Sequence, residues 1–133
     1  MIRLLPQNLR PKKTPAARPV VVLGSSSSEV FDYIFGNQPG YHPFWAGGWS
    51  ARGLRSVEHE QYLQKILQPI SRDAVLLLNF GCTDIVFNFR HMAHTRGEYD
   101  FRSILDQAAA GIQNCKRVLN KMGFKTTYAT FIS

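Results

Sequence analysis

Serine is concentrated directly after the first strongly apolar segment of the chain. Residues 20–23 are Val, Val, Val and Leu, Gly24 follows, and residues 25–28 are four serines. A hydroxyl at the end of a buried strand and near the start of a helix can act as a nucleophile. Together with helix N–H groups, such hydroxyls can also hold an anion such as phosphate. The same residues fit a serine-rich turn that only caps the next helix.

Histidine and cysteine offer little further chemistry. His91 and His94 lie three residues apart in RHMAH and could share one face of a helix, but no third metal ligand can be placed beside them. We expect both to be solvated histidines in a loop. Cys82 has no base placed next to it, so we expect a small buried residue rather than a nucleophile. The sequence therefore predicts no metal site and no cofactor.

Hydrophobic patterning predicts strands that alternate with helices. The apolar runs predict strands over residues 20–23, 43–46, 74–80 and 124–133. Helices are expected over residues 29–36, 56–67 with Ser56 as the cap, and 100–123 with Gly123 as the stop. A long connection is expected between the third strand and the last helix.

This alternation predicts the fold class. Strands separated by helices form right-handed units with parallel strands, so we expect an α/β domain of three layers with helices on both faces of the sheet. In the flavodoxin-like order the first and third strands are neighbours, and their loops then meet at a crevice at the carboxyl edge of the sheet. The domain is expected over residues 20–133, incomplete at its C-terminal edge, after a basic, proline-rich flexible arm over residues 1–19.

Three segments, each after an expected strand, resemble the sequence blocks of the SGNH (GDSL-like) hydrolases. VVVLGSSSSEVF resembles the first block, G-D-S-x-S, with Ser25 where the family usually has aspartate. GGWSARGL resembles the second block. LLLNFGCTDI resembles the third, G-x-N-D, with Thr83 in place of asparagine. The order of the three blocks is that of the family, whereas each segment alone also fits a loop or a strand-ending turn.

The resemblance implies a role for each matched residue. Ser26 would be the nucleophile, and its N–H would form the oxyanion hole together with Gly48 and Thr83. A threonine hydroxyl is shorter than the asparagine amide that the family uses, so this part of the hole departs from the pattern. The supporting residues implied by the match are Gly24, Gly81 and Asp84, of which Asp84 would orient loops.

The fourth block of the family, D-x-x-H, supplies the general base and the aspartate that orients it. No D-x-x-H occurs in this sequence, which resembles the N-terminal two-thirds of the family. The resemblance therefore predicts a serine esterase or carbohydrate acetylesterase that is inactive or weak as this chain.

Charge and composition limit the classes of partner that we expect for this protein. Of the 16 basic residues, five lie in residues 1–19 without an acidic residue, and the remaining 11 are nearly balanced by 9 acidic ones. The net charge of +7 therefore belongs largely to the arm, and nucleic-acid binding is not expected beyond weak contacts of the arm. No apolar run reaches the roughly 20 residues of a membrane span, so we expect a cytoplasmic protein that does not bind membranes.

Three functions stay open. The first is hydrolysis of a small acyl ester or an acetylated carbohydrate by Ser26. The second is a non-catalytic fragment that binds a carbohydrate, an acyl ligand or a partner chain. The third is a flavodoxin-like domain that binds a phosphate or a nucleotide, although neither phosphate-binding glycine motif is present. Self-association through the last strand is also expected, because the edge of a sheet presents unpaired backbone groups.

Overall fold

The sheet of this protein has four parallel strands. The computed structural model describes residues 18–97 and 99–130. The strands are β1 (Val20–Gly24), β2 (Tyr41–Trp45), β3 (Val75–Asn79) and β4 (Thr126–Ala129), in the spatial order β2-β1-β3-β4. All three strand pairs are parallel. The order matches the first four strands of the flavodoxin-like order, as the sequence predicted.

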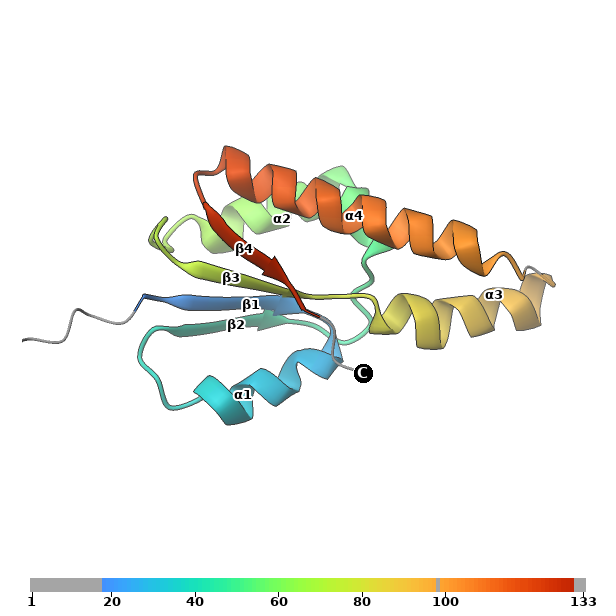
Figure 1. Cartoon of the computed structure of the whole chain (residues 1–133), viewed down its shortest axis with the longest axis horizontal. Coiled ribbons are helices and arrows are strands. Elements are labelled where there is room, and N and C mark those ends of the chain that lie inside the picture. The colour runs from blue at the N-terminus through green and yellow to red at the C-terminus, as the bar shows by residue number, and fades with distance from the viewer. Residues whose placement is uncertain (1–17, 98, 131–133) are drawn as a thin grey trace, which may run out of the picture.

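Helices lie on both faces of this sheet. Figure 1 shows α2 and α4 over one face and α1 over the other, while α3 extends past the carboxyl edge of the sheet beside α4. The α-helices are α1 (Val30–Phe35), α2 (Val57–Leu67), α3 (Phe89–Arg96) and α4 (Phe101–Lys121). Three shorter helical segments are η2 (Ser26–Glu29), η3 (Arg52–Arg55) and the π-helix η4 (Thr83–Asn88). The architecture is the expected three-layer α/β arrangement.

The main core lies between the sheet and the layer of α2 and α4. Side chains alternate between the two faces of a strand, so Val21 and Leu23 of β1 share a face with Leu76 and Leu78 of β3. These four side chains are in one buried cluster with residues of α2 and α4. The helical members of the cluster are Leu63, Leu67, Ala108, Cys115 and Leu119.

Two helix starts follow the expected capping chemistry. The Ser56 hydroxyl accepts a hydrogen bond from the His59 backbone N–H at 3.2 Å, at the start of α2. The Asp100 carboxylate accepts one from the Ser103 N–H at 2.9 Å, at the start of α4. Gly111 of α4 lies so near Ala51 that an added Cβ would be 1.8 Å from the Ala51 carbonyl oxygen. Glycine at this position therefore lets α4 pack closely on the segment before η3.

Two sequence-based expectations about these elements were wrong. The connection between β3 and α4 is largely helical, because η4 and α3 cover residues 83–96. The pattern gave no sign of this because α3 has no buried residue, and Phe87 of η4 is 64% exposed. The second strand begins and ends earlier than expected, at Tyr41 and Trp45. The predicted end of the fourth strand at residue 133 lies outside the described residues.

The start of the domain is anchored by its own side chains. Arg18, which the sequence placed in the arm, donates hydrogen bonds to the Asp73 carbonyl at 2.7 Å and to Thr126 Oγ1 at 2.9 Å. The Pro19 carbonyl accepts a hydrogen bond from Val75 N at 2.8 Å. Residues 1–17 lie outside the described part. Among the described residues, no helix combines the length and apolar character needed to cross a bilayer.

Candidate functional site

The loops that follow β1, β2 and β3 share one edge of the sheet because the three strands run in parallel. Backbone hydrogen bonds join neighbouring loops at this edge. Ala46 N, after β2, donates to the Gly24 carbonyl at 3.0 Å, and Ser25 N donates to the Asn79 carbonyl at 3.3 Å. The ends of β1, β2 and β3 are therefore held together where the sequence predicted a crevice.

Residues 25–28, here called the serine loop, are fixed by Asn79. The side-chain amide of Asn79 donates to Ser28 Oγ at 3.0 Å and to Ser27 Oγ at 3.3 Å. Ser28 is fully buried, and its hydroxyl is also 3.5 Å from the Asn79 carbonyl oxygen. A buried hydroxyl needs such partners because an unpaired one costs free energy. The loop thus has a defined conformation that side chains of β3 help to set.

Gly24 allows this close packing at the end of β1. A Cβ built on Gly24 would lie 2.0 Å from Ser28 Oγ and 2.6 Å from the Asn79 carbonyl oxygen. Any side chain at this position would push the serine loop away from β3. The glycine is therefore required by the approach of Ser28 and not by an unusual backbone conformation.

Ser26 is the most open hydroxyl of the serine loop. It is the first residue of η2 and is exposed, whereas Ser25 and Ser28 are buried. The Ser25 and Ser27 hydroxyls are 3.2 Å apart and form a hydrogen bond with each other. The Ser26 hydroxyl makes no hydrogen bond to any described residue, so it is available to a molecule from solvent.

Gly48 and Thr83 lie in the loops that follow β2 and β3, at the same edge. Gly48 is exposed and has a φ of +77°, a conformation that favours glycine. Thr83 is 8% exposed and is the first residue of η4. No hydrogen bond between described residues joins either of them to Ser26. The three residues therefore share one edge of the sheet, and hydrogen bonds among the described residues do not link them.

Asp84 ties the loop after β3 to the segment after β2. Its carboxylate is completely buried and accepts hydrogen bonds from Ala51 N at 2.7 Å and Arg52 N at 3.2 Å. The Arg52 Nε atom lies 3.6 Å from Asp84 Oδ1 and completes an ion pair. A buried carboxylate is stable only with partners of this kind. Asp84 therefore positions the start of η3. Gly81, which precedes it by three residues, is buried with a φ of +112°.

The four histidines lie on β2, α2 and α3. His91 and His94 are exposed on α3, so the expectation that they lie in a loop was wrong, although they are solvated. His59 Nδ1 is 2.6 Å from the hydroxyl of Ser56, the residue that caps α2. No described histidine forms a hydrogen bond with a residue of the serine loop. In the described part of the chain no group of three His, Cys, Asp or Glu residues could hold a metal ion.

A small aromatic cavity adjoins Gly48. It has a volume of about 260 Å³ and is lined by Ala46, Trp49, Glu58, His59 and Tyr62. The Trp49 ring stacks on His59 with centroids 5.5 Å apart and meets the edge of Phe80 at 5.0 Å. The Trp49 indole N–H is buried and has no hydrogen-bond partner in the described part of the chain. The cavity is large enough for a short acyl chain or a single ring.

Sequence reasoning missed Asn79 and the cavity residues His59 and Tyr62. Asn79 had a usable signal, since it is the one polar residue in an otherwise apolar strand segment and aligns with Gly24 in the sheet. No such signal marked the cavity, because its residues come from the loop after β2 and from α2 and also fit ordinary packing positions.

Comparisons with models of protein families, with curated proteins and with solved structures find no match to this chain. The resemblance to the SGNH hydrolases therefore stays a prediction from the three sequence segments.

Proposed function

We propose that this chain carries the nucleophile and the oxyanion-binding groups of a serine acyl-ester hydrolase of the SGNH type. The observation that carries the proposal is the position of Ser26. Ser26 is exposed, follows a buried parallel strand and lies in the loop that Asn79 holds. β2 and β3 end at the same edge of the sheet, so the loops that follow them begin beside this loop. The Ser26 hydroxyl oxygen would attack the carbonyl carbon of the ester, the bond from that carbon to the alkoxy oxygen would break, and the hydroxyl proton would pass through water to the departing alcohol. A water molecule would then cleave the acyl-serine, release the acid and restore the hydroxyl.

The oxyanion formed in that step would be held by backbone N–H groups. The N–H of Ser26 is in the first turn of η2, where the amides of a helix have no partner within the helix. Gly48, with no side chain, would add a second N–H if its loop moves toward the substrate. Thr83 would add its hydroxyl. The cavity beside Gly48 would receive the acyl group or the sugar ring of the substrate.

The rate is expected to be low because Ser26 has no base among the described residues. A general base contributes about 10²- to 10⁴-fold to such a reaction. Nucleophilic attack by a neutral hydroxyl is slow, and the preorganised loop supplies only position and charge stabilisation. We therefore expect slow hydrolysis of activated esters and no measurable hydrolysis of alkyl esters.

The test is the steady-state hydrolysis of p-nitrophenyl acetate by the full chain and two variants. Ser26→Ala should lower the rate to the background of the buffer. Ser27→Ala is the matched control, because it removes a neighbouring hydroxyl of the same loop, and it should leave most of the rate. Equal rates for the full chain and Ser26→Ala would overturn the proposal. Rapid turnover abolished by Ser26→Ala would show that a base is present.

A second function is favoured by the aromatic cavity, namely binding of a carbohydrate or acyl ligand without hydrolysis. Its walls are aromatic, and Glu58 offers a carboxylate that can accept hydrogen bonds from sugar hydroxyls. N-acetylglucosamine is a suitable probe because it has both a ring and an acetyl group. It should change the fluorescence of Trp49 in the full chain and not in Tyr62→Ala. Binding without hydrolysis would support this function over the first.

A further inference from the structure

A basic pocket lies between η3 and α3. Its volume is about 170 Å³, and it is lined by Arg52, Asn88, His91, Met92 and Arg96. Four of these residues come from η4 and α3 and one from η3. The pocket is therefore built from two segments that Asp84 holds together.

The guanidinium of Arg52 has too few partners for its donors. Its side chain is only 25% exposed, and its Nε atom is buried without a hydrogen bond to any residue that the structure describes. Asp84 Oδ1, at 3.6 Å from Nε, is close enough for charge attraction and too far for a good hydrogen bond. The Nη1 group donates to Met92 Sδ at 3.6 Å, and a thioether is a weak acceptor. The half-buried Arg52 guanidinium therefore has N–H donors that lack a strong acceptor.

The charges around the pocket are not balanced. Arg96 adds a second guanidinium, and His91 and the Asn88 side chain add nitrogen donors. No carboxylate is among the described residues that line the pocket. The nearest partner of Arg52 is Asp84, which is completely buried and already accepts two backbone hydrogen bonds. Asp84 pairs with Arg52 alone, and Arg96 forms no ion pair with a described residue.

We propose that this pocket binds a compact oxyanion, a phosphate or carboxylate group of a small ligand. Arginine forms paired hydrogen bonds with both groups because its planar fork matches two oxygen atoms. The volume suits one such group with part of the molecule that bears it. The site does not depend on the proposed ester hydrolysis, since it uses neither Ser26 nor the serine loop.

The main competitor for an anion within this chain is its basic N-terminal segment. Residues 1–19 contain five basic residues and no acidic one, so they can also attract phosphate. The pocket and the segment make different predictions. Binding in the pocket needs Arg52 and Arg96, whereas attraction to the segment is independent of both. The experiment must therefore locate the bound ion as well as measure its affinity.

The experiment is a titration of the isotope-labelled full chain with inorganic phosphate at low ionic strength, followed by amide NMR shifts. A parallel titration with acetate tests a carboxylate. We expect saturable shifts at residues 52, 88, 91 and 96, for phosphate, acetate or both. The better ligand of the two indicates which group the natural ligand carries.

Two variants test the assignment. Arg96→Gln should weaken binding about tenfold, because a hydrogen bond between charged groups is lost. Arg90→Gln is the matched control, since it removes an exposed arginine of the same helix that does not line this pocket, and it should change the affinity less than about twofold. Equal losses in both variants would overturn the proposal, because they would indicate unspecific attraction.

Arg52→Lys tests whether anion binding needs the planar shape of the Arg52 guanidinium or only its positive charge. Lysine keeps the positive charge beside Asp84 and lacks the planar fork, so the fold should be retained while the affinity for phosphate falls. Arg96→Gln keeps the proposal testable if Arg52→Lys proves unstable, because Arg96 is exposed. Shifts confined to residues 1–19, or no saturable shift at all, would rule out the pocket as an anion site.

Discussion

The side-chain amide of Asn79 donates a hydrogen bond of 3.0 Å to the buried hydroxyl of Ser28. The two residues are 51 positions apart in the chain, and their contact joins the end of β3 to the loop after β1. Ser26 lies in this loop, between the end of β1 and the fixed residue Ser28, and is exposed. The position of the proposed nucleophile thus depends on Asn79, a buried residue at the end of β3.

Replacing Asn79 with alanine should therefore loosen the serine loop. The change removes the two hydrogen bonds that the Asn79 amide donates to the hydroxyls of Ser27 and Ser28. The buried Ser28 hydroxyl then keeps only its 3.5 Å contact with the backbone carbonyl of residue 79. We expect a loss of about 1–3 kcal/mol in the free energy of unfolding. Urea unfolding measures this loss. Asn120→Ala is the control, since Asn120 is exposed on α4, and it should change stability by less than about 0.5 kcal/mol. Equal stabilities of the two variants would contradict the role of Asn79.

Asp84 should be among the most sensitive positions in the chain. Asp84→Ala removes the acceptor of two backbone N–H groups and leaves Arg52 without its carboxylate. The expected cost is about 3 kcal/mol, because breaking a buried ion pair leaves an uncompensated charge. Thermal unfolding should compare it with Asp106→Ala, which breaks an ion pair whose carboxylate side chain is 73% exposed. A small effect for Asp84→Ala, similar to that of the control, would contradict this account.

The two cysteines should differ in reactivity and in their effect on alkaline stability. Burial raises the pKa of the Cys115 thiol from the ordinary 9.0 to about 12, whereas Cys82 is only partly buried. The folded state then holds a proton that the unfolded state releases near pH 9. The contribution of the Cys115 thiol to the stability of the fold is complete below the pKa of this thiol in the unfolded state. It is lost as the pH rises from 9 toward 12.

Two measurements check this difference. Iodoacetamide should modify Cys82 in the folded protein and Cys115 only after unfolding. Between about pH 8 and pH 11 the full chain should lose more stability than Cys115→Ala, with Cys82→Ala as the control that behaves like the full chain. Modification of Cys115 in the folded state at the rate of Cys82 would contradict its burial.

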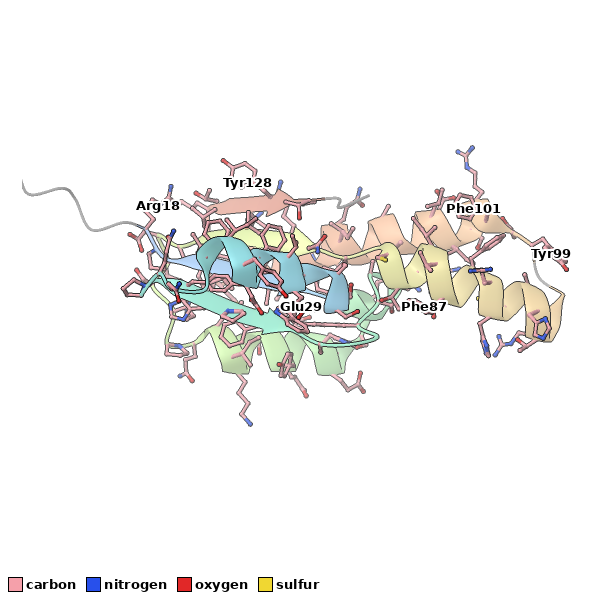
Figure 2. All side chains as sticks on the ribbon, turned by 90° about the horizontal axis from the view of Figure 1, so that it is seen from below. Arg18, Glu29, Phe87, Tyr99, Phe101 and Tyr128 are labelled. Carbon is pink, nitrogen blue, oxygen red and sulfur yellow. The ribbon has the colours of Figure 1, made fainter. Side chains whose placement is uncertain are left out.

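The outer edge of β4 should promote self-association. β4 is the last strand in the sheet order, and Tyr128 on it is 58% exposed. Figure 2 shows Tyr128 on β4, at the edge of the sheet. Unpaired strand edges and exposed apolar side chains both favour contact between copies. The rest of the expected strand, residues 131–133, lies outside the described residues.

Light scattering over a range of concentrations tests this expectation. The mass should rise above the 15.1 kDa of one chain, and Tyr128→Lys should shift the balance toward the monomer, because charge on an edge strand opposes pairing. A monomer at all concentrations, with strong protection of residues 126–129 from amide exchange, would show that β4 needs no partner.

The sequence predicted the parts of the fold that depend on local patterns. β1 follows an apolar run, and β3 is apolar up to Asn79. Ser56 caps its helix as expected, and the last helix begins after Asp100, close to the expected residue 100. α3 was missed because it packs no buried side chain and so carries no apolar stripe. Figure 2 shows Phe87, Tyr99 and Phe101, which lie before and after α3 in the chain, and all three side chains are exposed.

The candidate site was only partly predictable for a related reason. Ser26 follows a strand, and its place at the edge of the sheet follows from the strand order. The contacts that fix the site join distant residues, such as Asn79 with Ser28 and Asp84 with Ala51. No spacing in the sequence encodes such contacts, because they depend on which strands and loops become neighbours.

The most direct test of the central claim is the site of acylation by p-nitrophenyl acetate. If Ser26 is the nucleophile, peptide mass spectrometry after brief exposure should find one acetyl group on Ser26. Little should be found on Ser27 or on Ser103, a serine of α4 outside the loop. The adduct should disappear in Ser26→Ala and persist in Ser27→Ala. Acetylation spread evenly over serines and lysines, with none enriched at Ser26, would contradict the proposed role of this residue.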